Sequence, residues 1–242
     1  MLNDPSAVTV CVVIPLYNAA ASIQRTLDSV CAQTRPPDKV IVVDDGSSDA
    51  GPEIVRQYAA PFPIVLLQQP NQGPASARNR GVFSAEETFI AFLDADDRWH
   101  PEKLQKQLAL HAELTRQGRK VGLIDCFQMS EFSDGKRQLE DRCKHGDHFV
   151  DFMRENIING TSGVLALREI IAAVGGFDQS LRFAEDRLLW TRIAEISEIH
   201  SVPQILHWRA VNAANITAQP HKYYPHKLRF IQLYLARYGT RL

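Results

Sequence analysis

The sequence has few cysteines and no long apolar run, and both absences narrow the possible classes of protein. Its four cysteines, in 242 residues, form no C-x-x-C pair. A disulfide-stabilised secreted fold is therefore disfavoured, and a reducing compartment is favoured. No uninterrupted apolar stretch approaches the roughly 20 residues of a transmembrane helix, and the amino terminus lacks the features of a signal peptide. We therefore expect a cytoplasmic protein.

The sequence also lacks an excess of charge of either sign. It has 27 basic and 28 acidic residues and a formal net charge of −1. This balance gives no overall field that would attract nucleic acid, so we expect no nucleic-acid partner. The G-x-G-x-x-G and Walker patterns are missing as well, which removes support from dinucleotide and P-loop sites.

What is present is a regular alternation of two patterns in the first half of the chain. Short apolar segments typical of buried strands lie at 9–16, 39–43, 63–68, 88–93 and 121–127. Segments with helical periodicity lie at 19–34, 51–60, 73–85 and 101–114. This alternation predicts an α/β fold with a mostly parallel, Rossmann-like sheet and helices on both faces.

The alternation weakens after residue 127. A hairpin is expected around the Asp134-Gly135 turn, followed by shorter helices and strands. We expect one domain over 1–242, in which about 8–127 forms one half and about 128–220 forms the second wall of a cleft. A basic, amphipathic helix is expected at about 222–239, and it either packs on its own domain or lies on a membrane surface.

Three carboxylates are crowded at the end of the fourth expected strand, at Asp94, Asp96 and Asp97. Two carboxylates about 4 Å apart repel by roughly 4 kcal/mol at an effective dielectric of 20. Acids at a helix start explain one of them through the helix dipole, but not three. A divalent cation with oxygen ligands, Mg²⁺ or Mn²⁺, together with substrate phosphates would relieve the repulsion. The D-x-D spacing thus predicts a metal site.

A second acidic pair, Asp44 and Asp45, ends the second expected strand. It either belongs to a turn and helix cap or accepts a hydrogen bond from a base with an N–H on its pairing edge, such as uracil or guanine.

Arg78 lies in the first turns of the helix at 73–85, where it faces solvent or holds a phosphate or a base. The Glu185-Asp186 pair is consistent with ordinary acids in a first helical turn. The Cys143, His145 and His148 cluster is interpreted as a surface loop.

The order of six motifs adds to these separate observations. VVIPLYN, VVDDGSSD, NQGPASARNRG, FLDADD, GGFD and ED with LLWTR follow one another between about Val10 and Thr217. In this order they closely resemble the family-2 glycosyltransferases of the GT-A fold. The resemblance implies an inverting enzyme that moves a sugar from a nucleotide diphosphate donor, usually a UDP-sugar, to an acceptor hydroxyl.

The resemblance also implies roles for residues of this chain. Pro15 and Tyr17 would line the base pocket, and Asp45 would accept a hydrogen bond from uracil N3–H. Arg78 would contact the nucleotide and Asp94 the ribose. Asp96 would bind Mn²⁺ or Mg²⁺, and Asp186 would act as the general base.

The resemblance is looser at 207–217, where a phosphate role for Arg209 is expected only from partial similarity. The Q-x-x-R-W pattern of polysaccharide synthases is missing, which favours a single-addition enzyme that uses a glycan or lipid-linked acceptor in cell-envelope synthesis, at or near the inner face of the plasma membrane. Two other functions stay open. A sugar nucleotidyltransferase would need a glycine-rich, basic amino-terminal loop, and a non-catalytic nucleotide-sugar-binding protein would lack transfer.

Overall fold

A computed structural model describes residues 8–211 and 220–241 of the chain. Its strands are β1 (Val10–Leu16), β2 (Lys39–Asp44), β3 (Ile64–Gln68), β4 (Phe89–Phe92), β5 (Arg98–Trp99), β6 (Val121–Phe132), β7 (Arg137–Glu140), β8 (His145–Gly146), β9 (Leu165–Leu167) and β10 (Glu198–Val211). Its helices are α1 (Ile23–Cys31), α2 (Gly51–Gln57), α3 (Pro74–Ser84), α4 (Lys103–Arg116), α5 (Phe149–Arg154), α6 (Arg168–Ala173), α7 (Glu185–Ala194) and α8 (Pro220–Tyr238), with short 3-10 helices η2 (Thr161–Gly163) and η4 (Gly239–Arg241).

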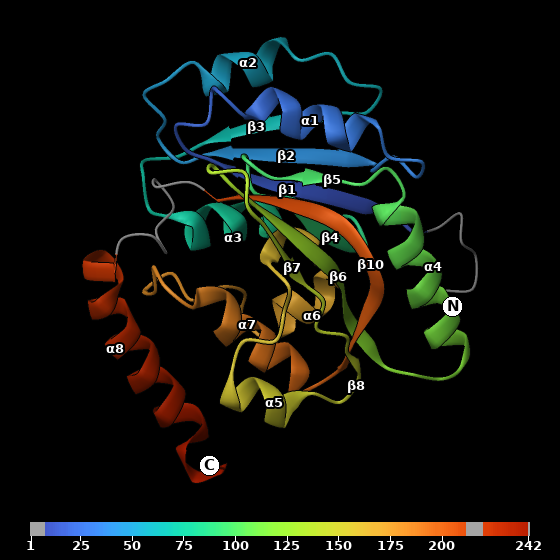
Figure 1. Ribbon diagram of the computed structural model, residues 1–242, viewed down its shortest axis with the longest axis vertical. Coiled ribbons are helices and arrows are strands. Elements are labelled where there is room, and N and C mark those ends of the chain that lie inside the picture. The colour runs from blue at the N-terminus through green and yellow to red at the C-terminus, as the bar shows by residue number, and fades with distance from the viewer. Residues whose placement is uncertain (1–7, 212–219, 242) are drawn as a thin grey trace.

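One mixed sheet forms the centre of the molecule, with strand order β3-β2-β1-β4-β9-β6-β10-β5 (Figure 1). The first four strands in this order are parallel to one another. Helices cover both faces, as the alternating pattern predicts: α1 and α2 lie on one face and α3, α6 and α7 on the other. β1 has buried side chains on both faces, which explains why its sequence is a continuous apolar run.

The sheet changes character at β9, which runs antiparallel to both of its neighbours, β4 and β6. The parallel description therefore applies to the amino-terminal half and to the β6–β10 pair, while the rest of the sheet is mixed. The hairpin predicted at Asp134-Gly135 joins β6 to β7, with Gly135 in a left-handed conformation at φ 84°. β5 was not predicted, because two residues are too few to show a periodic pattern.

β10 is a single long strand that pairs in parallel with β6 and has register shifts along its length. It meets β5 antiparallel through His207 and Trp208. Because β6 and β10 carry the second half of the sheet past the end of β4, residues of both strands reach the edge at which the β4 loop emerges. Gln128 and Arg209 are the clearest examples.

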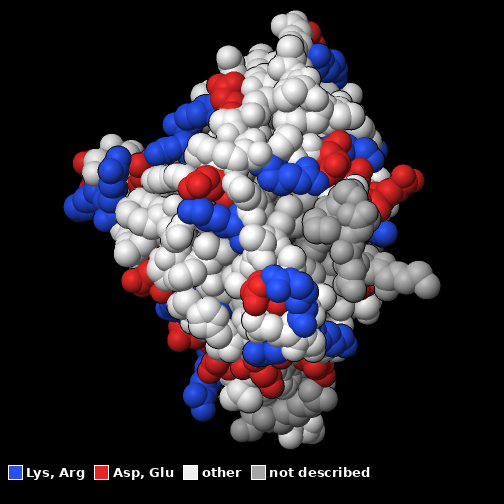
Figure 2. All heavy atoms as spheres, turned by 90° about the vertical axis from the view of Figure 1, so that its right-hand side faces the viewer, with Lys and Arg blue, Asp and Glu red and all other residues white. Residues whose placement is uncertain are grey.

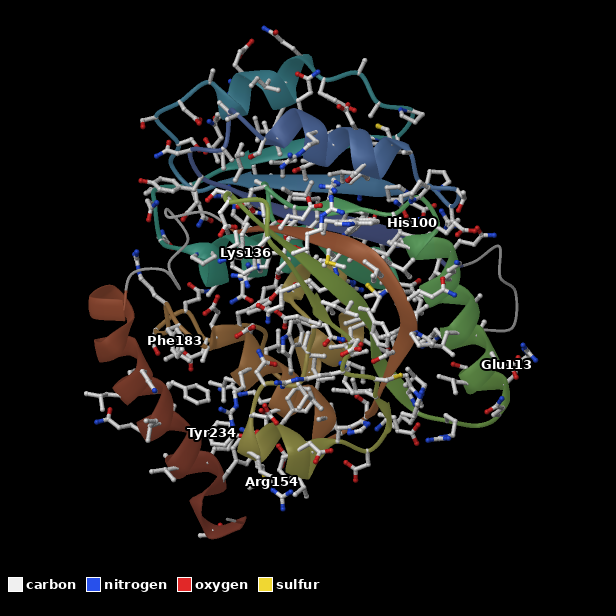
Figure 3. The ribbon with its side chains drawn as sticks, viewed as in Figure 1. His100, Glu113, Lys136, Arg154, Phe183 and Tyr234 are labelled. Carbon is white, nitrogen blue, oxygen red and sulfur yellow. The ribbon has the colours of Figure 1, made fainter. Side chains whose placement is uncertain are left out.

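α8 packs on the rest of the chain through one of its faces. Phe230, Tyr234 and Tyr238 are buried in a cluster with residues of α5, α7 and the loop between α6 and α7. The Tyr234 hydroxyl donates a hydrogen bond to the Phe152 carbonyl oxygen at 2.8 Å (Figure 3). Of the two expectations for the carboxyl-terminal helix, packing on its own domain is therefore confirmed for this face.

Two surface properties follow from the described residues. None of their helices is both long enough and apolar enough to span a lipid bilayer. On the face that carries α4, basic and acidic side chains are interspersed and form no patch of one sign (Figure 2). This face gives no indication of an extended anionic partner.

Candidate active site

The ends of three parallel strands bring the first group of predicted residues to one edge of the sheet. The Asp45 N–H donates to the Leu16 carbonyl oxygen at 2.8 Å, and the Leu93 N–H donates to the Val13 carbonyl oxygen at 3.1 Å. The loops after β1, β2 and β4 are therefore neighbours. In open α/β sheets, ligands bind beyond such carboxyl ends.

Asp45 is buried, and its carboxylate accepts three hydrogen bonds from the protein. Oδ1 accepts from the Gln69 amide nitrogen and the Gln72 N–H, and Oδ2 accepts from the Gly73 N–H, each at 2.8 Å. Asp45 therefore holds the turn that starts α3. A carboxylate has about four acceptor positions, so one on Oδ2 is left for a base N–H.

Pro15 and Tyr17 lie beside Asp45 on the neighbouring strand. Pro15 is half-buried near the end of β1 and is in register with Val43 of β2, whereas Tyr17 is 54% exposed just after β1. An exposed aromatic ring next to an acceptor carboxylate has the chemistry needed to stack on a base and fix its pairing edge.

Helix α3 connects the group around Asp45 with the acidic loop after β4, because it starts beside Asp45 and bears Arg78, which contacts Asp94. A β-carbon at Gly81 would lie 2.4 Å from Val13 Cγ1, so only glycine allows α3 to approach β1 this closely. Arg78, with a side chain 7% exposed, donates to Asp94 Oδ1 at 2.7 Å and to Glu185 Oε1 at 3.3 Å. One guanidinium thus bridges the β4 loop and the start of α7.

Phe177 of the GGFD motif packs against Arg78 and is held by the neighbouring Asn79. The Asn79 side-chain amide donates to the Phe177 carbonyl oxygen and accepts from the Phe177 N–H, both at 2.8 Å. The Phe177 ring lies 5.5 Å from the Arg78 guanidinium carbon. The Nε of Arg78 is buried and has no hydrogen-bond partner among the described residues. This unmet donor makes the surroundings of Arg78 receptive to an anion.

The three acids after β4 have different environments. Asp97 is buried, accepts from the Ser162 hydroxyl and accepts from the Ala210 N–H at 3.0 Å, so it ties the loop to η2 and β10. Burial and the charges of Asp94 and Asp96 raise the pKa of Asp97 well above its usual value. Asp94 pairs with Arg78 and keeps a side chain that is 34% exposed.

Asp96 is half-buried between these two acids. Burial, and secondarily the charge of Asp94, raises the pKa of Asp96, whereas the Arg209 and Arg25 charges lower it. Arg25 also donates to the Asp96 backbone carbonyl oxygen at 3.1 Å. The loop therefore crowds negative charge that its protein neighbours only partly balance.

Glu185 and Asp186 start α7, directly after Ala184, which has a left-handed φ of 58°. This conformation is rare for a residue with a β-carbon and is often found at functional sites. Asp186 accepts from the Asn156 side-chain amide at 3.1 Å and from the Arg187 N–H at 2.7 Å. Burial, and then the Asp186 charge, raises the pKa of Glu185 to about 7 although Arg78 opposes the change.

A cavity of about 690 Å³ unites part of the predicted set. Arg78, Asp94 and Asp186 line it, and Asp97 and Glu185 are beside them. Among the described residues, four of the predicted set do not line this cavity: Pro15, Tyr17, Asp45 and Asp96. The predicted residues thus form two groups on one sheet edge, joined by α3, which Asp45 holds at its start and which carries Arg78.

Further cations and apolar groups complete the wall. Arg182 and Arg209 line the cavity from the loop before α7 and from β10, and Lys227, Phe230 and Ile231 line it from α8. The part of the 207–217 motif beyond Val211 lies outside the described residues. Another hollow of about 440 Å³ lies between α2 and β3, and no carboxylate lines it.

The oxygen donors of the acidic loop fit a hard divalent cation. Among the described residues, no group of three His, Cys, Asp or Glu side chains could hold a metal ion alone. Mg²⁺ in nucleotide sites typically takes one or two carboxylates and completes its shell with phosphates and water. The half-buried Asp96 carboxylate beside Asp94 supplies donors of this kind.

Several residues of the site were missed from the sequence. Glu185 was interpreted only as a first-turn acid, yet it contacts Arg78. Ser162 and Asn156 contact Asp97 and Asp186 from the α5–β9 region, and no sequence pattern marks them. The Cys143, His145 and His148 cluster is only partly a loop, because His145 belongs to β8, which pairs with β10. Cys143 lies 3.3 Å from His145 Nε2, and none of the three residues lines the cavity.

Comparison with known proteins places this site in a family. A model described as glycosyl transferase family 2 matches residues 11–174, more than half of the chain. The amylovoran biosynthesis glycosyltransferase AmsB of Erwinia amylovora is 42% identical over 128 residues, which cover 51% of this chain and 42% of the relative. The chain spans about a third to two thirds of the length of the first curated relatives that it matches.

Solved structures have the same fold. S. aureus TarS 1-349 in complex with UDP-GlcNAc matches with a TM-score of 0.73 and 21% identity, over 94% of this chain and 66% of that chain. The mannosyltransferase PcManGT from Pyrobaculum calidifontis, in complex with GDP-Man and Mn²⁺, matches with a TM-score of 0.66 and 25% identity, over 90% and 61%. The fold is therefore of the GT-A type, and the chain belongs to glycosyl transferase family 2.

Proposed function

We propose that this chain is an inverting, metal-dependent glycosyltransferase that transfers a sugar from a nucleoside diphosphate sugar to an acceptor hydroxyl. The observation that carries the proposal is the single cavity that contains both the Arg78–Asp94 pair and Asp186. A cation and a carboxylate at one end, and a second carboxylate on the opposing helix, match a reaction that releases a diphosphate while a hydroxyl loses its proton.

The donor that we propose is a UDP-sugar. Asp45 and the exposed Tyr17 ring adjoin at the strand ends, and the free acceptor position of Asp45 suits a base with an N–H on its pairing edge. Uracil and guanine both have this N–H. The two solved neighbours carry these two bases, UDP-GlcNAc in one and GDP-Man in the other. Arg78, on the helix that starts at the Asp45 turn, would contact the nucleotide on its diphosphate side.

The transfer step follows from these assignments. The acceptor oxygen forms a bond to the anomeric carbon while the bond from that carbon to the diphosphate oxygen breaks, and the leaving UDP takes the electron pair. Attack from the side opposite UDP inverts the configuration. Asp186, oriented by Asn156, takes the hydroxyl proton. Arg78 orients Asp94 and Glu185 around the reacting groups.

Asp96 would hold Mg²⁺ or Mn²⁺ bound with the donor, and this ion would supply positive charge where the diphosphate leaves, while Asp94 would face the ribose. The acceptor that we propose is a glycan or a lipid-linked glycan of the cell envelope, and the enzyme would act on the cytoplasmic side. AmsB takes its name from amylovoran biosynthesis, which supports this context. We propose that 8–127 holds the donor and 128–220 the acceptor.

Release of UDP from UDP-sugars in the presence of Mn²⁺ tests the proposal. Asp186→Asn keeps the shape of the side chain but removes the base, so we expect UDP release to fall by about 10²- to 10⁴-fold. Donor affinity, measured by calorimetry, should stay within about twofold of the wild type, because Asp186 takes the acceptor proton rather than holding the nucleotide.

Asp134→Asn is the matched control, since Asp134 lies in the exposed β6–β7 turn. This variant should release UDP at the wild-type rate. Equal rates for Asp186→Asn and Asp134→Asn would contradict the role of Asp186, and failure of every nucleotide sugar to bind would contradict the transferase as a whole.

A further inference from the structure

α8 has a second apolar stripe next to the face that packs on the chain. Leu228, Ile231 and Leu235 are spaced at i, i+3 and i+7 and are 65%, 40% and 51% exposed. This spacing places them along one side of the helix. In Figure 1, α8 stands at the margin of the molecule, and the three side chains of the stripe remain exposed, with Ile231 at the edge of the cavity.

The charges around the stripe are of one sign. The segment 220–242 has five Lys and Arg residues and no Asp or Glu. The side chains of Lys227 and Arg229 flank Leu228 and are exposed. Arg237, in contrast, pairs with Glu195 of the neighbouring helix at 3.1 Å, so its charge is already balanced. An exposed apolar stripe with unbalanced cations beside it is the pattern of a helix that lies in a membrane interface.

We propose that α8 docks the protein on a bilayer surface that contains anionic lipid. The apolar stripe would enter the acyl boundary, while Arg229 would contact lipid phosphates. A second copy of the chain fits the surface less well, since the segment 220–242 of both copies would bring cations to the contact and no Asp or Glu to balance them. With so few apolar side chains, the contact is reversible and depends on the charges.

The docking would also orient the cavity. Lys227 and Ile231 belong to the same helix and line the cavity that contains Asp186. Contact of the stripe with a bilayer therefore places one side of the cavity wall at the lipid surface, within reach of an acceptor hydroxyl on a lipid-linked glycan. The docking itself does not depend on the transfer reaction, because it can be measured without a donor.

Sedimentation with vesicles tests the inference on the full chain. We expect binding to vesicles of phosphatidylcholine with phosphatidylglycerol, little binding to phosphatidylcholine alone, and loss of binding as salt is raised. Leu228→Ser/Leu235→Ser should weaken binding about tenfold or more, and Arg229→Gln should weaken it about fivefold. None of these positions lines the cavity, so UDP release without vesicles should not change.

Val65→Ser/Phe83→Ser is the matched control, because Val65 and Phe83 are exposed apolar residues of β3 and α3. It should bind vesicles like the wild type. Equal binding by the wild type and Leu228→Ser/Leu235→Ser, or no binding to anionic vesicles, would overturn the inference. A wild-type dimer in light scattering that becomes a monomer in Leu228→Ser/Leu235→Ser would assign the stripe to a second copy and would also overturn the inference.

Discussion

At the scale of single residues, Arg78 has contacts that its motif does not reveal. The resemblance implies a contact with the nucleotide, and in the structure its two terminal nitrogens also contact Asp94 and Glu185. Only Nε is without a partner among the described residues. Arg78 therefore positions two carboxylates from separate elements, and its fork of donors makes this possible.

Glu185 gives the first prediction at this scale. Its pKa is raised from 4.5 to about 7, chiefly by burial, so the folded protein favours its protonated form. This contribution to stability is fully present below the unfolded pKa of about 4.5 and is lost as the pH rises through about 7. Relative to Glu185→Gln, the wild type should therefore lose roughly 1 to 3 kcal/mol of unfolding free energy over this window.

Urea unfolding of both proteins at several pH values between about 4.5 and 8 measures this difference. Glu53→Gln, in the exposed first turn of α2, is the control and should follow the wild type across the same range. A constant difference between wild type and Glu185→Gln at all pH values would show that Glu185 is not protonated in this window.

At the scale of elements, the contact between α3 and β1 determines the site. Gly81→Ala would place a β-carbon 2.4 Å from Val13 Cγ1 and force the helix away from the strand. Alanine is the better helix former by about 1 kcal/mol, but overpacking costs about 1 to 3 kcal/mol. We expect a lower melting temperature, and a larger loss of UDP release than of stability, because Arg78 moves with the helix.

Thermal melts and UDP-release rates for Gly81→Ala check this prediction. Gly81→Ala/Val13→Ala removes both methyl groups that collide and should recover part of the activity. If Gly81→Ala melts and turns over like the wild type, α3 and β1 do not touch as closely as the structure indicates.

The helices and strands differ in how well they could be predicted from the sequence. Long apolar runs and helical stripes located β1 to β4 and α1 to α4 well, because each is regular over several residues. β5 has two residues, and β9 three with a 3-10 turn before them, so neither shows a period. The antiparallel direction of β9 depends on pairing with β4 and β6, which are distant in sequence.

In the candidate site too, local patterns could be predicted from the sequence, whereas contacts between distant residues could not. Acids at strand ends could be predicted, since strand direction brings such ends to one edge. The Arg78 contact with Glu185 joins residues 107 positions apart, and no local pattern reports it. The separation of the predicted residues into a cavity group and a group around Asp45 likewise arises from tertiary packing.

At the scale of the whole molecule, binding of the donor should stabilise the fold. At a ligand concentration of about 100 times Kd, we expect a UDP-sugar with Mn²⁺ to raise the melting temperature by roughly 5 °C or more. A chelator should reduce this shift, because the charge of the acidic loop would again oppose the diphosphate.

A CDP-sugar is the comparison for the same experiment. Cytosine has no N–H at the corresponding position of its pairing edge, so Asp45 has no donor to accept from, and the shift should be smaller. Equal shifts for UDP- and CDP-sugars would show that Asp45 acts only in the turn at the start of α3.

The structural contacts of Asp45 affect how the donor preference that we propose for this residue could be changed. Its carboxylate accepts from the Gln72 and Gly73 N–H groups, which directly precede α3, the helix that carries Arg78. A substitution of Asp45 intended to change which nucleotide is accepted would thus also loosen the start of α3 and displace Arg78. We therefore expect substitutions at Asp45 to alter donor preference and turnover together, so a change of donor preference is better begun at the exposed Tyr17.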